Sequence, residues 1–327
     1  MQLSKRLLLA AGAAALMTAA LGVAPNGAWA QAYPTQDIRF ICAFPAGSGA
    51  DVLVRFFEKK IREVSGKTII TENKPGAAGL VATEFVARAK PDGYTIFVHA
   101  GSAVANIPAM YKNPPIDVTK ALEIVGTINR QPFMIVVDAK SPYKTLADLT
   151  AAMKKKGDKA SYAYAATTGQ VMGELYKVGA GIKAVEVAYK TAADSLNDML
   201  SGRVDFGAHD PVFALAEERK GTLRSLGVST GTRLDANPQM KTMTEQGVPM
   251  DLTGWWAAMV PAGTPKHVKD TLNKWFVKAM QDPETKAYLN KFGGDPLIEA
   301  PEVAQKRLLK DIAAWKEYVK VAKIEPQ

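Results

Sequence analysis

The sequence predicts an α/β fold with two lobes, mainly parallel sheets and helices on both sheet faces. Apolar runs typical of strands alternate with amphipathic runs typical of helices along most of the chain. The chain has 327 residues, which is long enough to bury two cores. Two extended stretches, near 127–137 and 226–232, are candidates for crossings from one lobe to the other.

The expected elements follow one another with short connections. The predicted strands are 38–44, 68–71, 94–98, 123–137, 160–165, 184–188, 204–208, 223–228 and 254–260. The predicted helices are 51–65, 78–90, 145–156, 169–180, 192–201, 211–220, 265–281, 283–292 and 300–323.

Local signals support the helix at 51–65. Asp51 is a suitable N-cap, and Gly66 is a suitable stop. One face of this helix is apolar and comprises Val52, Phe56, Ile61 and Val64.

The helix at 265–281 has similar support. Pro265 suits a first turn, and Asp282-Pro283 ends the run before the next helix begins. Its apolar stripe comprises Val268, Leu272, Trp275, Phe276 and Ala279.

Residues 1–30 have the pattern of a cleaved signal peptide. Lys5 and Arg6 precede an apolar stretch from Leu7 to Val23, and Ala28-Trp29-Ala30 fits the small-x-small cleavage rule. The alternative is an uncleaved membrane anchor, but no stop-transfer charges follow the apolar stretch. We therefore expect an exported mature chain that begins near Gln31.

The two crossings predict how the mature chain divides. Residues 31–132 and 228–327 are expected to form lobe 1, which is discontinuous in sequence. Residues 133–227 are expected to form lobe 2.

Composition argues against several kinds of function. Cys42 is the one cysteine, so an intrachain disulfide is excluded, and three histidines offer little for a zinc site. Removing Lys5 and Arg6 with residues 1–30 lowers the formal charge from +9 to +7, and the remaining basic residues are scattered. The sequence has no run of interleaved basic and aromatic residues, which is the pattern typical of nucleic-acid binding. We expect neither a metal nor a cofactor.

The loop Pro45–Asp51 is the main candidate site. Its glycines let the backbone approach a ligand, and the following helix directs N–H groups and a partial positive charge toward an anion. Ser48 adds a hydroxyl. The loop lacks the lysine of a P-loop and the glycines that flank a nucleophile elbow. An ordinary strand-to-helix turn is the alternative.

Three later segments repeat this design, at 100–103, 165–170 and 189–194. Each follows a predicted strand, and ligands of open α/β sheets lie beyond the carboxyl ends of strands. Together with the first loop they describe a cleft, with two segments from each lobe. Core packing is the alternative for each segment alone.

His209-Asp210 follows the strand 204–208 and is a further candidate for the cleft wall. A histidine–carboxylate pair also suits acid-base catalysis. A secreted α/β hydrolase would need Ser48 or Ser102 as its nucleophile, and neither has the required spacing. Trp255-Trp256 is expected near the return crossing, as core or as a ligand contact.

The chain resembles the Bug family, the periplasmic solute receptors of tripartite tricarboxylate transporters. The resemblance covers nearly the whole mature chain. Phe44–Asp51 is similar to the family's first glycine loop, Phe-Pro-Pro-Gly-Gly-Gly-x-Asp. The other motifs, in order, are Tyr33-Pro34, Glu72–Gly79, Pro91–Thr95, Val187–Lys190 and Pro261–Pro265.

The resemblance implies a type II, Venus-flytrap periplasmic binding protein that is not an enzyme. Such a receptor captures a small organic carboxylate between its lobes and delivers it to inner-membrane transporter subunits. We expect a monomer. The ligand-binding residues that the resemblance and the loops together indicate are Ala46, Gly47, Ser48, Asp51, Ser102, Thr167, Thr168, Lys190, Thr191, Ala192, His209 and Asp210.

This chain departs from the family pattern in its predicted site. Ala46 and Ser48 replace a proline and a glycine, and His209 stands where an aspartate is frequent. An aspartate there can favour a ligand amine, whereas a histidine would not. A ligand sensor that docks on a membrane sensor kinase would have the same cleft, so this alternative stays open.

Overall fold

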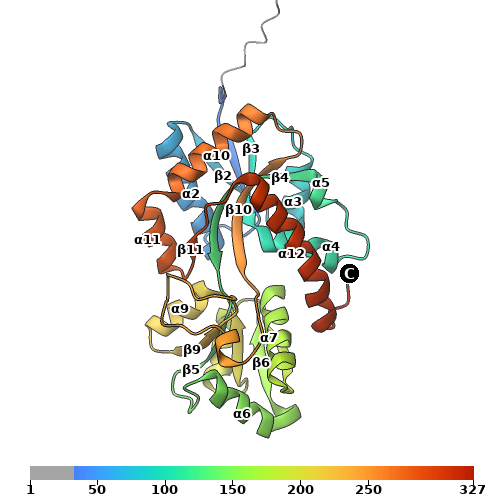
Figure 1. Cartoon of the computed structure of the whole chain (residues 1–327), viewed down its shortest axis with the longest axis vertical. Helices are drawn as coiled ribbons and strands as arrows, with labels where there is room; N and C mark the ends of the chain where they lie inside the picture. The colour runs from blue at the N-terminus through green and yellow to red at the C-terminus, as the bar shows by residue number, and fades with distance from the viewer. Residues whose placement is uncertain (1–32) are drawn as a thin grey trace, which may run out of the picture. The chain divides into compact units, whose positions relative to one another are not determined.

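The computed structural model describes residues 33–327, and the predicted signal peptide lies outside the described residues. The chain divides after Thr35, and the fold below is that of Gln36–Gln327 by itself (Figure 1). This unit contains two sheets, which define two lobes: lobe 1 around a six-stranded sheet and lobe 2 around a five-stranded sheet.

The sheet of lobe 1 has the order β11-β4-β10-β3-β1-β2. The strand β1 pairs in parallel with β2 and β3, whereas β10 is antiparallel to β3 and β4, and β11 to β4. Its strands are β1 (Ile38–Cys42), β2 (Ile69–Asn73), β3 (Thr95–Ala100), β4 (Leu122–Gln131), β10 (Gly254–Pro261) and β11 (Asp295–Pro296).

The sheet of lobe 2 has the order β7-β6-β8-β5-β9. The strand β6 is parallel to β7 and β8, and β5 is antiparallel to β8 and β9. Its strands are β5 (Met134–Asp138), β6 (Ser161–Tyr164), β7 (Val185–Ala188), β8 (Phe206–His209) and β9 (Leu223–Val228).

The α/β class with two lobes is confirmed, but both sheets are mixed and not mainly parallel. The chain leaves lobe 1 along β4 and returns along β10, and it enters lobe 2 along β5 and leaves along β9. Because the outgoing and returning strands lie side by side, they are antiparallel.

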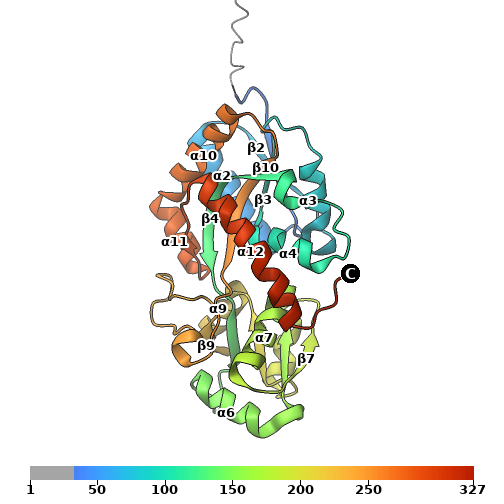
Figure 2. The ribbon, with the colours of Figure 1, turned by 45° about the vertical axis from the view of Figure 1, so that its right-hand side comes forward.

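Helices cover both faces of each sheet (Figures 1 and 2). In lobe 1, Phe276 of α10 stacks on Phe40 of β1 at 6.0 Å. The longer helices of lobe 1 are α2 (Gly49–Ser65), α3 (Leu80–Ala87), α4 (Gly101–Met110), α10 (Lys266–Met280), α11 (Pro283–Lys291) and α12 (Pro301–Val321), with the short α5 (Val118–Ala121). Those of lobe 2 are α6 (Leu146–Lys156), α7 (Thr167–Ala180), α8 (Leu196–Leu200) and α9 (Pro211–Arg219).

The C-terminal helix α12 contacts both lobes. It packs on α4 and β4 of lobe 1 and also contacts α7 of lobe 2. Trp255 Nε1 donates to Asp311 Oδ2 at 2.5 Å, and Tyr318 Oη donates to the Asp251 carbonyl at 3.0 Å. One group of buried apolar side chains accordingly includes Phe97 of β3, Phe206 of β8 and Trp315 of α12.

Most predicted elements are present within two or three residues of their expected ends, and Gly66 ends α2 in the left-handed conformation, as expected. The predicted strand 123–137 is wrong, because it is two strands, β4 and β5, in different sheets. Pro132 lies between them, and proline has no N–H to donate to a ladder.

The predicted helix 78–90 is also shorter than expected, since α3 ends at Ala87 and is preceded by a 3₁₀ turn at Ala77–Gly79. The helix α4 was not expected. Its N-cap, Ala100, has no polar side chain, and Pro108 lies inside the helix. Both features argue against a helix in a sequence-based prediction.

Candidate functional site

The first predicted loop leads from β1 into α2. The N-cap of α2 is Ser48 and not Asp51, because Ser48 Oγ accepts the Asp51 N–H at 3.2 Å. The intrahelical ladder begins at Val52, whose N–H donates to the Ser48 carbonyl at 2.9 Å. The amides of Gly49 and Ala50 therefore lie outside the ladder at the positive end of a 17-residue helix.

Asp51 is buried beneath this loop and organises it. Asn73 Nδ2 donates to Asp51 Oδ1 at 2.7 Å, while Arg55 Nε and the Gly47 N–H donate to Oδ2 at 2.9 and 2.8 Å. Burial opposes ionisation, but the hydrogen bonds from Asn73 and Arg55 outweigh it, so the pKa of Asp51 lies below its usual value. Its charge is thus compensated within lobe 1.

The second predicted loop is the first turn of α4. Ser102 is buried at the second position of this helix, after the N-cap Ala100, which provides no side-chain cap. The segment is therefore the start of a helix, although no helix was expected at these residues. A Cβ on Gly101 would lie 2.3 Å from the Trp255 ring, so only glycine fits there.

The third segment opens α7 of lobe 2. Thr167 and Thr168 are half-buried, and the N-cap Ala166 provides no side-chain cap. The helix starts at Thr167, two residues before the expected start. Thr167 lines a cavity of about 80 Å³ together with Ala77, Ala78, Asn106, Ile107, Met110, Tyr111 and the C-terminal Gln327. The start of α7 in lobe 2 thus lies close to α4 in lobe 1.

The fourth segment follows β7. Lys190 and Thr191 are exposed and Ala192 is half-buried. The Thr191 N–H donates to Asp194 Oδ2 at 2.9 Å, and the Asp194 N–H donates to Thr191 Oγ1 at 3.3 Å. Among residues 33–327, the Lys190 side chain forms no hydrogen bond or ion pair with another predicted residue.

His209 ends β8 as a buried side chain. Burial lowers its pKa to about 4, so the imidazole is neutral at pH 7. Its Nε2 lies 3.1 Å from Ser195 Oγ, and its ring meets Phe213 edge-on at 5.0 Å. Ser195 was not among the predicted residues, because a serine within a short helical turn carries no distinctive sequence signal.

Asp210 is the N-cap of α9. Its Oδ1 accepts the N–H groups of Val212 and Phe213 at 3.0 and 3.1 Å. Burial raises its pKa, and the two backbone hydrogen bonds offset only part of that effect. The sequence signal for this cap is Asp-Pro, with Pro211 at the first helical position.

Two contacts bring predicted segments of different lobes together. A Cβ on Gly49 would lie 3.5 Å from Val212 Cγ1, which places the start of α2 beside the start of α9. The cavity at Thr167 makes a second link, between the start of α7 and the C-terminal half of α4 at Asn106, Ile107 and Met110. The starts of α2 from lobe 1 and of α7 and α9 from lobe 2 therefore face the junction of the lobes, where α4 contributes its C-terminal half.

An aromatic cluster next to the first loop was not expected. His99 stacks on Phe97 at 4.7 Å, and Phe44 lies 5.3 Å from His99 and 5.8 Å from Trp256. Burial lowers the pKa of His99 to about 3, and its Nδ1 has no hydrogen-bond partner among residues 33–327. Trp256 belongs to this cluster, whereas Trp255 packs on α4 and α12.

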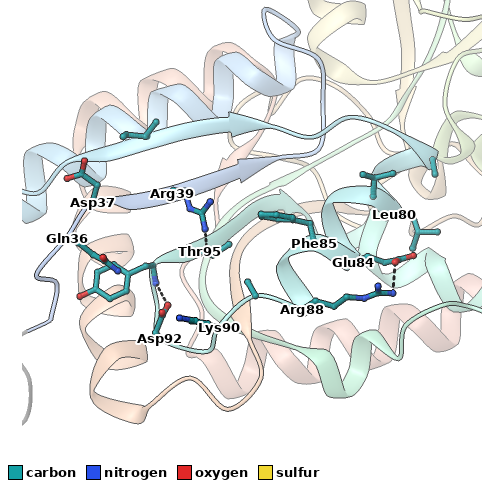
Figure 3. A pocket seen from close by; sticks show the side chains of 15 residues that line it. Gln36, Asp37, Arg39, Leu80, Glu84, Phe85, Arg88, Lys90, Asp92 and Thr95 are labelled. Atoms are coloured by element: carbon teal, nitrogen blue, oxygen red, sulfur yellow. Dashed lines mark hydrogen bonds and ion pairs between the residues drawn. The ribbon is translucent and has the colours of Figure 1, made fainter.

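A hollow larger than the cavity at Thr167 lies elsewhere. A groove of about 1220 Å³ runs between α3 and the strands β1, β2 and β3 of lobe 1 (Figure 3). Its walls include Ile70 and Phe85, with the ion pair of Glu84 and Arg88 at its rim. None of the twelve predicted ligand-binding residues lines this groove. We therefore locate the candidate site at the helix starts and not in the groove, although the groove has the greater volume.

Residues 33–327 lack two further kinds of feature. They contain no cluster of three or more histidine, cysteine, aspartate or glutamate residues that could hold a metal ion. Within the same range, no helix has the length and apolarity needed to cross a membrane.

Known proteins resemble this chain over most of its length. A UPF0065 protein of Bordetella bronchiseptica is 31% identical over 309 residues, which cover 94% of this chain and 91% of the relative. The structure of the periplasmic binding protein BugD has a TM-score of 0.77 at 28% identity and covers 90% of this chain and all of its own. The structure of Rpa4515 of R. palustris with adipate has a TM-score of 0.80 at 26% identity, with the same coverage.

The family model "Tripartite tricarboxylate transporter family receptor" matches residues 53–323. The match begins within α2 and ends just after α12, so it includes the sheet of lobe 2, both crossings and every strand of lobe 1 except β1. This chain therefore belongs to the family of tripartite tricarboxylate transporter receptors, which are periplasmic solute-binding proteins.

Proposed function

We propose that this receptor captures a small organic carboxylate between its two lobes and hands it to the membrane subunits of a tripartite tricarboxylate transporter. The observation that carries the proposal is the convergence of helix starts from both lobes: the start of α2 lies beside that of α9, and the start of α7, which has no side-chain cap, lies beside α4. Uncapped N–H groups at helix N-termini are donors for a carboxylate.

The charges around the predicted site suit an anion. The charge of Asp51 is compensated by Arg55 and Asn73, and Asp210 is engaged by the first turn of α9. Lys190 is an exposed cation on the loop after β7. Charge-assisted hydrogen bonds from ordered donors are among the strong ones, so a carboxylate is the favoured ligand. The adipate in Rpa4515 supports this ligand class.

The same proposal includes the expected organisation of the chain. Residues 1–30 are a cleaved signal peptide, residues 31–132 and 228–327 form lobe 1, and residues 133–227 form lobe 2. In support, the chain passes from the first sheet to the second between Gln131 and Met134 and leaves the second after Val228. The mature protein acts as a periplasmic monomer that binds its ligand without chemical turnover.

A thermal-shift screen of residues 31–327 tests the binding role. The panel contains adipate and other mono- and dicarboxylic acids, with and without amines and rings. An acid at 100 times its dissociation constant should stabilise the protein by about 2.7 kcal/mol and raise the midpoint by several degrees.

A saturable shift with one acid and none with its amide would support the carboxylate site. Absence of any shift, with protein shown to be free of co-purified ligand, would overturn it. Uptake of that acid by proteoliposomes that contain the transporter subunits, with and without this receptor, tests delivery. Hydrolysis of model esters would contradict a purely binding role.

A further inference from the structure

A buried serine connects two segments of the predicted site in lobe 2. Ser195 is 0% exposed, and its Oγ lies 2.6 Å from the Ala192 carbonyl oxygen and 3.1 Å from His209 Nε2. The strand order β7-β6-β8 places β6 between the strands from which these two segments emerge. The contact thus bridges a whole strand.

The chemistry of the three groups fixes the direction of the hydrogen bonds. A carbonyl only accepts, so the Ser195 hydroxyl donates to Ala192, since two oxygens 2.6 Å apart without a hydrogen between them would repel. Met199 Sδ, at 3.8 Å, is a weaker competing acceptor. The single hydroxyl proton is then used, and His209 Nε2 must carry a proton and donate to Ser195 Oγ.

We propose that Ser195 is the positioning residue of the ligand loop Lys190–Ala192. It acts through a relay in which His209 Nε2–H donates to Ser195 Oγ and Ser195 Oγ–H donates to the Ala192 carbonyl. Because the peptide unit is planar, fixing this carbonyl also fixes the direction of the next N–H, that of Ala193. The proposal rests on the proposed function for its ligand, but the relay itself exists without ligand.

The relay has a spectroscopic signature. In protein with ¹⁵N-labelled histidine, the long-range ¹⁵N–¹H spectrum should show His209 as the Nε2–H tautomer at pH 7, assigned by the loss of its signals in His209→Gln. Ser195→Ala should remove the hydrogen bond and speed exchange of the Nε2 proton. A His209 with its proton on Nδ1 would overturn the relay, whether or not any acid binds.

The positioning role is tested by affinity. Ser195→Ala should raise the dissociation constant by about five- to tenfold, the size expected for one lost hydrogen bond. Isothermal titration would use adipate or, if adipate gives no thermal shift, the acid of the screen that does. Ser195→Thr keeps the hydroxyl and should restore most of the affinity.

Ser225→Ala is the matched control. Ser225 is a nearly buried serine of the same lobe, on β9, and it donates to Glu218 Oε2 at 3.0 Å with Met134 Sδ at 3.9 Å. This variant should lose stability without losing affinity. Equal loss of affinity in both variants, or none in Ser195→Ala, would overturn the positioning role. Failure of every acid to bind, with the expected His209 tautomer, would overturn the proposed function and leave the relay standing.

Discussion

At the scale of single residues, buried polar side chains hold the loops of the predicted site in place through hydrogen bonds. Asp51 ties the first loop to β2 through Asn73, and His209 ties the end of β8 to the loop after β7 through Ser195. Neither side chain is exposed. The site loops therefore depend on residues whose own hydrogen bonds are satisfied within the protein.

Asp51→Asn should weaken both folding and ligand binding. The amide has one acceptor oxygen where the carboxylate has two, so it leaves either Asn73 Nδ2 or both the Gly47 N–H and Arg55 Nε without an acceptor, at a cost of about 1–3 kcal/mol. Urea unfolding and isothermal titration would measure the two effects. Asp117→Asn, at the exposed N-cap of α5, is the control. Tighter binding by Asp51→Asn with unchanged stability would show instead that Asp51 repels the ligand.

Stability should fall in mild acid because two histidines are buried in the neutral form. The unfolded chain takes up a proton on each near pH 6.5, whereas the folded pKa values are about 4 for His209 and about 3 for His99. The unfolded state thus binds more protons between pH 6.5 and 4, and the free energy of unfolding falls as pH drops through this window, by up to about 1.4 kcal/mol per pH unit for each group.

Urea unfolding at several pH values would measure this slope. His209→Gln should reduce this slope by the contribution of one proton. A slope that does not change in His209→Gln would contradict a buried neutral His209.

At the scale of elements, the close packing of α7 on β8 fixes the start of that helix. A Cβ on Gly169 would lie 2.5 Å from the Ala208 carbonyl oxygen, so the first turn of α7 rests directly on the backbone of β8. Thr167 and Thr168 are held by this contact more than by a cap, since Ala166 provides none.

Gly169→Ala should displace the first turn of α7. We expect a loss of about 1–3 kcal/mol in stability from overpacking and a larger loss of affinity than stability alone explains. Gly202→Ala is the control. Gly202 has a φ of +74° and no neighbouring atom within 4 Å of the position that a Cβ would take, so alanine there strains the backbone without a steric clash. The loss of stability should be similar to that of Gly169→Ala, but it arises away from the site. If both variants bind the acid equally well, the start of α7 is not a ligand contact.

At the scale of the whole receptor, the proposed function requires the lobes to close on the ligand. Closure is a hinge motion about the crossing strands, and a ligand that bridges both lobes selects it. Of the described residues, only Cys42 is a free cysteine and it is buried, so spin labels can be introduced at new cysteines.

The pair Lys67→Cys and Lys155→Cys places one exposed label on each lobe. The distance distribution from pulsed electron resonance should shift and narrow when the acid is added. The pair Lys67→Cys and Lys278→Cys lies within lobe 1 and should not change. Saturable binding without any change in the first pair would contradict closure.

The sequence by itself determined the α/β class, the family and most elements, because strand and helix periodicity, caps and short motifs are local signals. Gly66 and the Asp282-Pro283 break ended their helices as expected. It also indicated the loops that follow β1, β6, β7 and β8, whose role in ligand binding stays a prediction.

Only the tertiary structure decided what depends on partners distant in the chain. The strand 123–137 is divided between two sheets, and α4 forms despite Pro108 because it packs between β10 and α12. Asp51 is an organiser because Asn73, 22 residues away, reaches it. Ser195 gains its role from His209, 14 residues further along the chain and across one strand. Such pairings leave no local pattern, because the residues meet only when the sheets have formed.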